Sequence, residues 1–501
     1  MKRIINYLVF FSPFLAALIA TYLTFSDVWL VWLAYGVWLA MFTGFFVFLN
    51  YTLVTLRYRK YDTRYVGKPL NLRIAAFVTS FNEDRGIIKD TLLSVKAALK
   101  GRGDVYLLDD STRPEIVKEM EEFCKANGIY YIHRTDRRGF KAGAINNALR
   151  LVGDKYDLVA IFDADQRPTS GFFDAVIPFF RDENVAFVQV PQKYTETDSY
   201  VSQGAKFQQE PFLRIIMRGR SRTSAFSLGS GTVFRASVLK EVGGMDESSI
   251  TEDAATSVKI HSMKYLSPYL DEELIWYGEP PPDASAYVQQ QSRWSFGYFQ
   301  LTPNLLKMNL DIQVFFDYAA GFYYWLKEGI LTLFEIIAPI FFLLLRRPYI
   351  KLDPFLYAIV YFPYLFFSTA IFTYSIRSKT YGLRGFLLHQ FVEYIAFFGL
   401  TVSFFSWLAR RKRPFKVTPK GRGRRAFGVV VPHVFFDILL LLSIFAGVAW
   451  YPSAPMILQA AILVNLFWAI WHYFFLTGSI IVALSVPRER EEAKYVEKIK
   501  K

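Results

Sequence analysis

The chain contains a single cysteine, Cys124, in 501 residues. One thiol excludes an intrachain disulfide and any metal site built from several cysteines. Cys124 lies in a run typical of a helix, EMEEFCKANG, and we interpret it as a packing residue. The sequence also has no internal repeat and no low-complexity linker, which excludes solenoid and other repeat architectures.

Charged residues are scarce, at 20% of the chain, whereas 53% of the residues are hydrophobic and 18% are aromatic. An ordinary soluble protein is less apolar, so the composition predicts a membrane protein with a soluble part. The formal net charge is +14, but the basic residues cluster beside apolar segments, as they do in cytoplasmic loops. We therefore interpret the charge as a topology signal and expect no nucleic-acid partner.

Long apolar runs flank a less apolar middle part. The first two runs, 4–25 and 28–56, are each long enough to cross a hydrocarbon core of about 30 Å. The basic stretch 57–65 that follows is expected on the cytoplasmic side. Later in the chain an amphipathic stretch at 303–318 is expected to lie in the membrane interface, and spans fit at 323–345, 354–376, 428–451 and 455–484.

The apolar segment 385–408 precedes a basic loop, 410–425, that should be cytoplasmic. The two spans before this segment already return the chain to the cytoplasm, so a further crossing would export the loop. We therefore expect 385–408 to lie flat in the cytoplasmic interface, although its hydropathy alone would permit a crossing. This topology has about six spans in the cell membrane, with both termini in the cytoplasm.

From about residue 70 to residue 301, short apolar strands alternate with amphipathic helices. This pattern predicts an α/β domain with a mostly parallel sheet, whose ligands collect at the carboxyl ends of the strands. We expect strands at 72–81, 104–110, 128–134, 157–165 and 185–192. The chain then divides into a transmembrane hairpin at 1–57, a cytoplasmic α/β domain at 58–301, interfacial helices with two spans and the basic loop at 302–427, and two spans with a short tail at 428–501.

Two carboxylates one residue apart, Asp163 and Asp165, end the fourth expected strand. Alternate residues of a strand point to the same side, so both carboxylates can face one point. Such a pair favours a cation, and Mg²⁺ is usually held by one or two carboxylates together with substrate phosphates. The first hypothesis is a metal-bridged nucleotide diphosphate, and the alternative is a solvated acidic turn.

Three further groups of residues suit the same chemistry. They are Lys141 in FKAGAINNAL, Glu252 and Asp253 before a helix start, and Gln290, Arg293 and Trp294 in a QxxRW pattern. Arginine binds phosphate oxygens two at a time, and tryptophan offers a flat face to a sugar ring. Each also has a simpler interpretation: a solvated lysine, a helix-start carboxylate favoured by the macrodipole, and a cation-π pair.

In their order, these motifs resemble the processive, membrane-embedded family 2 glycosyltransferases, most closely the cellulose synthase-like branch. The matching segments are Asp109-Asp110, FKAGAINNAL from Phe140, DAD at 163–165, GSG at 229–231, TED at 251–253, QQSRW at 290–294 and FKVTPK at 415–420. The resemblance covers nearly the whole chain. It implies a GT-A domain, and an inverting transfer of sugar from a nucleotide-sugar to the end of a growing β-linked polysaccharide.

The resemblance also implies a role for each motif residue. Asp253, with Glu252 beside it, would be the general base, and Asp163 and Asp165 would hold Mg²⁺ or Mn²⁺ and the diphosphate. The nucleotide would be bound by Asp109, Asp110, Lys141, Gln290 and Arg293. The acceptor would be bound by Trp294, Gly229 and Ser230, and the gating loop would contain Phe415, Val417, Thr418 and Lys420.

A polymer made at the cytoplasmic face needs a way out through the membrane. Glu335 lies inside a predicted span, where an ionisable side chain is costly unless it faces water or a partner. We expect a channel lined by Tyr323, Tyr324, Trp325, Glu335, Asn465, Trp468 and His472. The competing interpretation is that Glu335 forms a structural pair with a neighbour such as His433 or His472.

Two residues differ from those common in the cellulose synthase-like branch. Gln166 stands where a histidine is common, and Leu228 stands where many bacterial members carry cysteine. Both border the acceptor by similarity, so they leave its identity open. No cyclic-di-GMP-binding PilZ domain fits after residue 484, so activation by that nucleotide is not expected. A second copy of the chain, in a homo-oligomer, or an accessory secretion subunit is left open as a partner.

We expect UDP-glucose as the donor and a β-glucan as the product, with a GDP-mannose-dependent mannan synthase as the close rival. Two more distant hypotheses are a non-processive glycosyltransferase acting on a lipid acceptor and a transporter with a cytoplasmic regulatory domain. The FxVTxK loop argues against the glycosyltransferase with a lipid acceptor, and the acidic residues with QxxRW argue against the transporter.

Overall fold

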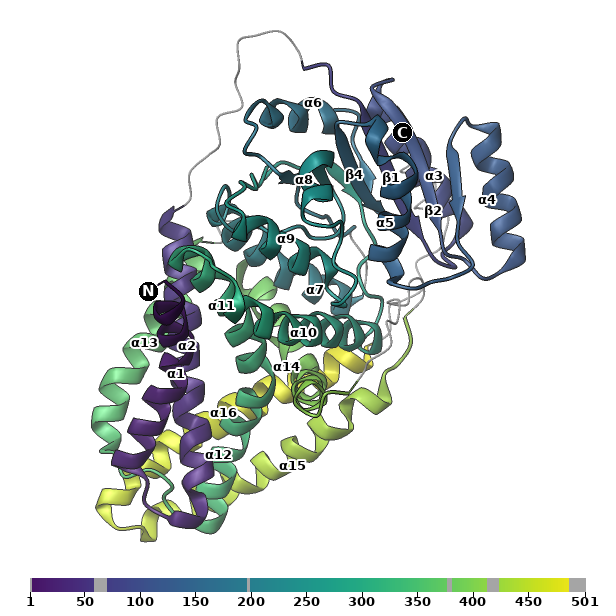
Figure 1. Cartoon of the computed structure of the whole chain (residues 1–501). Helices are drawn as coiled ribbons and strands as arrows, with labels where there is room; N and C mark the ends of the chain where they lie inside the picture. The colour runs from purple at the N-terminus through teal and green to yellow at the C-terminus, as the bar shows by residue number, and fades with distance from the viewer. Residues whose placement is uncertain (1, 58–69, 196–198, 376–380, 412–422, 486–501) are drawn as a thin grey trace.

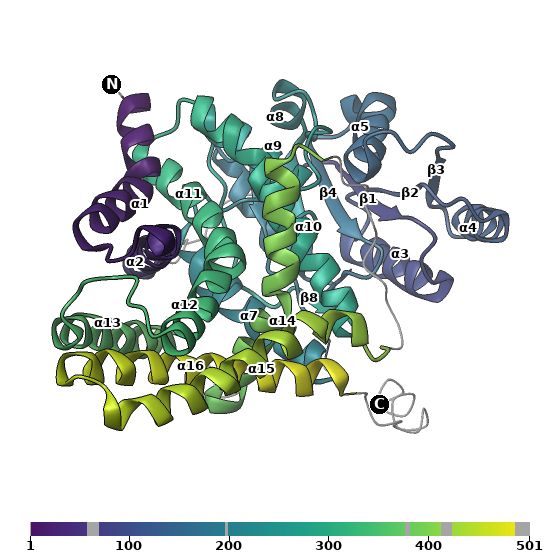
Figure 2. The same cartoon turned by 90° about the horizontal axis from the view of Figure 1, so that it is seen from below.

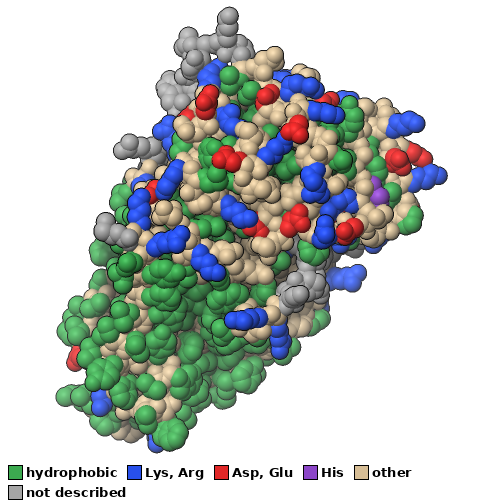
Figure 3. Space-filling model, in the orientation of Figure 1, with side chains coloured by type: hydrophobic (Ala, Val, Ile, Leu, Met, Phe, Trp, Pro, Cys, Tyr) green, Lys and Arg blue, Asp and Glu red, His purple; other side chains and the backbone are tan. Residues whose placement is uncertain are grey.

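The computed structural model describes residues 2–57, 70–195, 199–375, 381–411 and 423–485. Figure 1 shows an α/β domain stacked on a group of long helices. In the same orientation, hydrophobic side chains gather over the long helices, and charged side chains gather over the α/β domain (Figure 3). This division agrees with a membrane part and a soluble part.

Six strands form one sheet in the order β3-β2-β1-β4-β7-β6. Strands β1, β2, β3 and β4 are parallel, whereas β7 is antiparallel to both of its neighbours. The expected mostly parallel sheet and its five expected strands are confirmed, and β7 was not predicted. The bounds are β1 Ile74–Ser80, β2 Gly103–Asp109, β3 Tyr130–His133, β4 Leu158–Asp163, β6 Phe187–Gln189 and β7 Thr232–Arg235.

Strand β1 is buried on both faces, as a central parallel strand should be. Ile74 and Val78 belong to one hydrophobic core, and Phe77 belongs to the core on the opposite face of the sheet. Cys124 is buried in the first core, which confirms it as a packing residue. Burial raises the pKa of its thiol to about 12, so the thiol is unreactive.

Helices cover both faces of the sheet, and a two-stranded sheet of β5 (Arg167–Pro168) and β8 (Ile275–Tyr277) lies beside it. The helices of this domain are α3 Arg85–Leu99, α4 Pro114–Ala126, α5 Phe140–Val152, α6 Phe172–Val176, α7 Tyr200–Pro211, η4 Phe212–Met217, α8 Ala236–Glu241, α9 Glu252–Ser262 and α10 Ala284–Lys307. Helix α10 runs through the boundary expected after residue 301, so that boundary does not separate two structural elements.

Seven helical segments of the described chain are long and apolar enough to cross a membrane. They are built from α1 Lys2–Thr24, α2 Val31–Arg57, α11 Ile312–Leu326 with η5 Lys327–Leu331 and α12 Thr332–Leu345, α13 Pro354–Ser375, α14 Gly382–Leu408, α15 Phe427–Trp450 and α16 Met456–Leu484. The seven include α14, for which hydropathy alone permits a crossing.

Figure 1 presents α14 end-on, whereas α1, α2, α12 and α13 are seen from the side. Figure 2, viewed from below, shows α14 lengthwise, across α15 and α16. Helix α14 therefore crosses the other long helices, and it packs against α10 of the α/β domain. This orientation agrees with the prediction that the segment lies flat in the membrane interface, which stays a prediction.

The expected single interfacial helix at 303–318 is wrong. Helix α10 ends at Lys307 and α11 begins at Ile312, with Asp311 in an extended conformation at the N-cap position between them. From Ile312 the chain remains helical to Leu345, with a kink at Gly329. A Cβ at Gly329 would lie 3.1 Å from Leu400, so the kink brings η5 close against α14.

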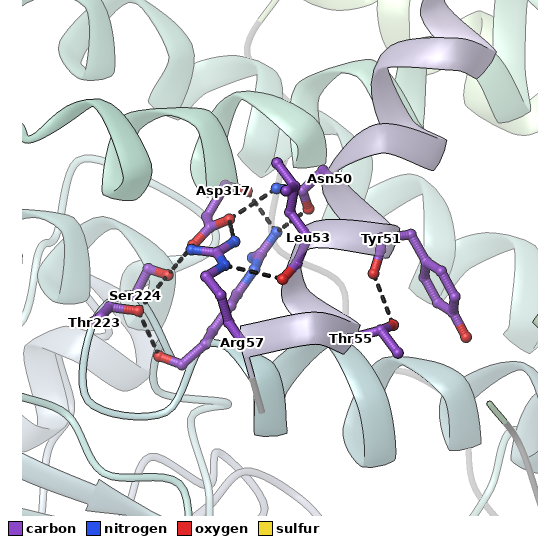
Figure 4. Close-up of polar contacts among 9 residues, drawn as sticks. Asn50, Tyr51, Leu53, Thr55, Arg57, Thr223, Ser224 and Asp317 are labelled. Carbon is purple, nitrogen blue, oxygen red and sulfur yellow. Dashed lines mark hydrogen bonds and ion pairs between the residues drawn. The ribbon is translucent and has the colours of Figure 1, made fainter. Parts of the chain in front are cut away.

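A buried ionic cluster joins the α/β domain to the first hairpin (Figure 4). The Asp317 carboxylate of α11 is fully buried and accepts hydrogen bonds from Arg57, Asn50 and Ser224 at 2.6, 2.8 and 2.6 Å. Arg220 donates to the Asp317 carbonyl at 2.5 Å. Arg57 and Asn50 belong to α2, and Ser224 and Arg220 follow η4. The cluster therefore fixes three separate parts of the chain to one another.

Candidate active site

A cleft opens at the carboxyl ends of β1, β2 and β4, where ligands of parallel α/β sheets collect. The start of α9 and one side of α10 complete its wall. It brings together most of the predicted site residues, namely Asp110, Lys141, Asp163, Asp165, Gly229, Glu252, Asp253, Gln290, Arg293 and Trp294. Asp109 and Ser230 do not line it.

Lys141 lies at the centre of the acidic side chains. Its Nζ donates to Asp163 Oδ1 at 2.5 Å and to the Gly229 carbonyl at 2.7 Å. Burial lowers the pKa of Lys141, but the negative charges of Asp163, Glu252 and Asp253 outweigh burial and raise it above its ordinary value. The lysine is therefore a fixed positive charge in the cleft, beside the first carboxylate of the DAD motif.

Asp163 is the last residue of β4, Asp165 lies in the turn that follows, and both line the cleft. Asp165 is buried, and its Oδ2 accepts from the Glu279 backbone N–H at 3.2 Å. No group of three or more potential metal-ligating side chains occurs among the described residues. Two carboxylates nevertheless fit a divalent cation whose other ligands are phosphate oxygens or water. The donor set thus fits Mg²⁺ or Mn²⁺ when a diphosphate is bound.

The loop that contains Gly229 is held by a buried glutamine, Gln189. The Gln189 amide oxygen accepts from Leu228 N–H and from Thr232 Oγ1, and its nitrogen donates to the Ser230 carbonyl. Gly229 adopts φ +79°, a left-handed conformation that favours glycine. A Cβ at Gly229 would lie 3.2 Å from both Asp253 Oδ2 and Lys141 Nζ, so the glycine leaves room between the acid and the lysine.

Ser230 supports the end of β4 and does not line the cleft. Its hydroxyl accepts from the Asp163 backbone N–H at 2.9 Å, and its side chain is fully buried. Its predicted contact with the acceptor stays a prediction. A serine between two glycines is as typical of a turn as of a binding loop, and the sequence alone does not distinguish the two.

Glu252 and Asp253 form the first turn of α9. Burial raises the pKa of Asp253, while the positive charges of Lys141 and Arg293 oppose this shift. Burial and the neighbouring Asp253 charge raise the pKa of Glu252 to about 7. Carboxylates with raised pKa values in a cleft suit general-base catalysis near neutral pH.

Helix α10 presents Gln290, Arg293 and Trp294 to the cleft because residues three and four apart share one helix face. Gln290 Nε2 donates to the hydroxyl of Tyr194 at 3.2 Å, and Gln209 Nε2 donates to the same hydroxyl at 2.9 Å. Tyr194 lines the cleft and was not predicted, since no motif marks it.

The opposite side of α10 packs closely on α14. A Cβ at Gly399 of α14 would lie 2.5 Å from the Val288 side chain. Ser403 Oγ donates to the Ser292 carbonyl at 3.2 Å. Helix α10 therefore connects the cleft directly to α14, the helix that lies across the other long helices.

Asp110 and Asp109 have different roles. Arg134 Nε and Nη2 donate to the two oxygens of the Asp110 carboxylate at 2.8 and 2.6 Å. Asp109 is buried and accepts from Tyr131 Oη and the Ser111 backbone N–H at 2.8 and 3.0 Å. The Asp109 carboxylate thus links β2 to β3 and does not line the cleft, and its contact with the nucleotide stays a prediction. Arg134 was not predicted.

The same end of the cleft contains two further residues that sequence reasoning missed. The Arg137 guanidinium lies 3.3 Å above the centre of the Phe81 ring, and both residues line the cleft. The Arg137 Nε and the hydroxyl of Ser80 are buried without a hydrogen-bond partner in the described part of the chain. Unpartnered buried groups around Asp110 favour a polar ligand at this end.

The predicted gating-loop residues Phe415, Val417, Thr418 and Lys420 lie outside the described residues. Their role stays a prediction. The chain that leads into the loop is helical until Leu408, and it resumes at residue 423, where a Cβ on the glycine would lie 2.5 Å from the Pro282 carbonyl. The described end of the loop thus lies next to the start of α10.

The residues expected to line a channel are divided between different surroundings. Tyr323 is buried and donates to the Phe10 carbonyl of α1, so its predicted place in the channel is wrong. Tyr324 donates to Glu393 of α14 at 3.1 Å. Glu335 pairs with Lys327 at 2.6 Å, which agrees with the competing interpretation of a structural pair with a neighbour, although the partner is neither His433 nor His472.

Of the remaining expected channel residues, Trp325 lies on α11 with its ring against Tyr324, and the other three lie on α16. Asn465 donates to the Ala461 carbonyl of its own helix at 2.9 Å. His472 Nδ1 lies 2.8 Å from the hydroxyl of Tyr394, and the Trp468 ring packs against Tyr361. These contacts place aromatic and polar groups in the membrane part, in clusters between α13, α14 and α16.

The part of the chain that forms the cleft is similar to known glycosyltransferases. Residues 71–297 match the family model described as glycosyltransferase like family 2. The chain is 27% identical over 440 residues to cellulose synthase 2 of Novacetimonas hansenii, covering 84% of this chain and 27% of that protein. It is 30% identical over 237 residues to the UDP-forming cellulose synthase catalytic subunit of Pseudomonas fluorescens, covering 46% of this chain and 31% of that protein.

Among solved structures, a mannosyltransferase of Pyrobaculum calidifontis in complex with GDP-Man and Mn²⁺ is 17% identical, with a TM-score of 0.46 over 58% of this chain and 80% of that chain.

The chain spans about a third or less of the length of the two cellulose synthase relatives. The family model covers the whole cleft-forming domain. Residues 71–297 therefore form a family 2 glycosyltransferase domain, and over most of its length the chain is similar to cellulose synthases.

Proposed function

We propose that the protein is an inverting, processive synthase that transfers glucose from UDP-glucose to the end of a growing β-glucan. The observation that carries the proposal is the single cleft in which Asp253, Lys141, Asp163 and Arg293 meet Trp294. A base carboxylate, a second carboxylate for a metal ion, two positive charges and an aromatic platform suit the displacement of a nucleotide diphosphate by a sugar hydroxyl.

The reaction begins with the Asp253 carboxylate, which accepts the proton of the acceptor hydroxyl. The oxygen of that hydroxyl attacks the anomeric carbon of the donor sugar, and the bond from that carbon to the diphosphate oxygen breaks. One displacement without a covalent enzyme intermediate inverts the anomeric configuration, so an α-linked donor gives a β-linked product. Gly229 leaves the space beside Asp253 in which the acceptor hydroxyl approaches.

The leaving diphosphate gains negative charge as the bond breaks. Lys141 and Arg293 supply positive charge at the carboxyl edge of the sheet, and Arg293 offers a planar fork for phosphate oxygens. Asp163 and Asp165 would hold Mg²⁺ or Mn²⁺ against the diphosphate, and the metal would neutralise part of its charge. The nucleoside would lie at the Asp110 end, next to Arg137 and Phe81.

The acceptor end of the glucan would stack on Trp294, and the chain would leave through the protein's own membrane helices. Support comes from hydrogen bonds that continue from the cleft into the membrane part. Gln290 contacts Tyr194, Tyr194 contacts Gln209, and the adjacent residue Gln208 donates to Tyr324 at 3.3 Å. Tyr324 in turn contacts Glu393, as described above. These polar groups are better suited to contact a hydrated glycan than to contact lipid.

The remaining features of the proposal concern location and gating. The α/β domain and both termini would lie in the cytoplasm, with about six spans in the plasma membrane. Thr418 and its neighbours would close over bound nucleotide and exclude water during transfer. A homo-oligomer or an accessory secretion subunit would be compatible with this arrangement.

The test is to incubate the purified protein in detergent with labelled UDP-glucose or GDP-mannose, with either Mg²⁺ or Mn²⁺. The product is then sized and digested with linkage-specific hydrolases. High-molecular-weight β-glucan from UDP-glucose is the expected result, and the Asp253→Asn variant should make it about 10³-fold more slowly.

The same experiment decides between the competing functions. Polymer from GDP-mannose alone would select a β-mannan synthase, and a single sugar on lipid would select a non-processive glycosyltransferase. No turnover of either donor with either metal would contradict the proposal. GDP-mannose remains the close second donor because the described contacts of Asp110 do not distinguish the two bases.

A further inference from the structure

Gln166 immediately follows the DAD motif and lines the cleft. Its side chain is 4% exposed, and its Oε1 has no hydrogen-bond partner in the described part of the chain. Burying an amide oxygen without a partner costs free energy, and native proteins rarely leave one unpaired unless a ligand or water completes the site. The position therefore calls for a donor from a bound molecule.

The backbone around Gln166 is fixed. Its N–H donates to the Asp163 carbonyl at 3.0 Å, which closes the turn that presents both aspartates. Its Nε2 lies against Gly278, where a Cβ would approach to 2.4 Å, so the glycine leaves space for the amide. The neighbouring Glu279 N–H binds Asp165, which ties both sides of the site together. Gln166 is therefore held in place before any ligand arrives.

A second unpartnered amide oxygen, Gln290 Oε1, lines the same cleft. Gln290 is anchored through its nitrogen to Tyr194, so its oxygen is likewise left for a ligand. Two buried acceptor oxygens without donors are complementary to a molecule with several hydroxyl groups. A sugar ring satisfies this requirement, whereas a phosphate or carboxylate oxygen would repel both amide oxygens.

We propose that Gln166 is a specificity-determining residue that accepts a hydrogen bond from a hydroxyl of the sugar being transferred. The inference rests on the proposed function and deepens it by assigning a contact to the donor sugar itself. Gln166 is placed at the donor, and not at the acceptor, because it shares one tight turn with Asp163 and Asp165. The sugar attached to a diphosphate held by these carboxylates must lie next to that turn.

The test compares binding of UDP-glucose and UDP by calorimetry with Mg²⁺ present, in full-length protein carrying Asp253→Asn to prevent turnover. Gln166→Leu removes the amide oxygen and leaves the sugar hydroxyl unpaired. It should weaken binding of UDP-glucose by about ten-fold and leave binding of UDP unchanged. Because UDP lacks the sugar, its unchanged affinity also reports that the variant is folded.

Two further variants sharpen the comparison. Gln166→Glu keeps an acceptor oxygen, so it should preserve the ratio of the two affinities even if its charge weakens both. Gln192→Leu is the matched control, because Gln192 lines the same cleft but its Nε2 already donates to the Leu228 carbonyl at 2.9 Å. The control should keep the parental ratio of affinities.

The inference is overturned if Gln166→Leu binds UDP-glucose and UDP in the parental ratio, or if Gln192→Leu changes the ratio as much. GDP-mannose and GDP are measured in parallel, and the same criterion applies if only the guanosine pair binds. Failure of the proposed function gives a different result, in which no nucleotide diphosphate binds to any variant, and it removes the basis of the inference as well.

Discussion

The guanidinium of Arg134 holds the carboxylate of Asp110 through two hydrogen bonds, of 2.8 and 2.6 Å. The same guanidinium donates to the carbonyls of Arg138 and Phe140, in the loop that leads to Lys141. Arg134 therefore positions both Asp110, the residue predicted to bind the nucleoside, and the loop before α5. This relationship leads to the first prediction.

Replacing Arg134 by leucine should weaken UDP binding by about ten-fold, because Asp110 and the loop lose their common support and charge-assisted hydrogen bonds contribute strongly. Calorimetric titration of UDP with Mg²⁺ measures this. Arg138→Leu is the matched control, since the exposed side chain of Arg138 lies outside the cleft lining and only its carbonyl takes part. Equal affinities of the Arg134→Leu variant and the parent would contradict the role.

The second prediction concerns the acid limb of the pH profile. The pKa of Asp253 is raised above its ordinary 3.8, chiefly by burial, so the carboxylate becomes protonated at a higher pH than a solvent-exposed aspartate. A protonated Asp253 cannot accept a proton from the acceptor. We expect kcat/KM to fall as pH decreases through this raised pKa, and Asp253→Asn to lose about 10³-fold in kcat. A rate that stays constant down to pH 4 would refute this prediction.

The third prediction uses Lys141 to move that limb. The positive charge of Lys141 lowers the pKa of both Glu252 and Asp253. Lys141→Met should therefore shift the acid limb of kcat/KM to higher pH, in addition to lowering the rate through weaker stabilisation of the leaving diphosphate. The limb position, measured from initial rates across pH, separates the two effects. A slower enzyme with an unshifted acid limb would show that Lys141 acts only on the leaving diphosphate, and it would contradict the predicted pKa effect.

The fourth prediction tests the gating loop. Thr418→Ala should slow polymer synthesis, because the loop would close less well over bound nucleotide, while the melting temperature and UDP affinity stay at parental values. Rates from labelled donor, together with thermal melting in detergent, check this outcome. Unchanged turnover would exclude a gating role for Thr418.

The fifth prediction concerns stability at the junction of Figure 4. Asp317→Asn removes the charge that compensates the Arg57 and Arg220 guanidinium groups, and breaking a buried ion pair costs about 3 kcal/mol. The melting temperature in detergent should fall clearly. Asp311→Asn, at the start of the same helix, removes pairs with Lys2 and Lys264 that are about half exposed, and it should cost about 0.5 kcal/mol. Equal losses in the two variants would contradict the special role of the buried cluster.

Much of the fold could be predicted because the patterns are local. The strands ending at Asp109 and Asp163 are apolar runs bounded by polar residues, and the helix from Phe140 has a regular apolar face. Strand β7 was missed because it is only four residues long and follows two glycines. The break between α10 and α11 was missed because the apolar pattern continues across it, while Asp311 starts a new helix.

Motif order predicted most of the residues that line the cleft, but it could not predict hydrogen-bond partners that lie far away in the sequence. Asp109 and Asp110 are adjacent, yet one reaches Tyr131 and the other Arg134, and only the sheet register decides which faces the cleft. Lys327 was overlooked as the partner of Glu335 because the distortion at Gly329 brings two successive helical segments together. Such pairings depend on tertiary structure.

The close packing of α10 on α14 has a mechanical consequence. Because a side chain at Gly399 would collide with Val288, the two helices have no room to slide independently. A change of bilayer thickness or lateral tension that tilts α14 would therefore shift the platform of Trp294 relative to the sheet. Turnover in reconstituted vesicles should accordingly depend on the acyl-chain length of the lipid, even though no lipid takes part in the reaction.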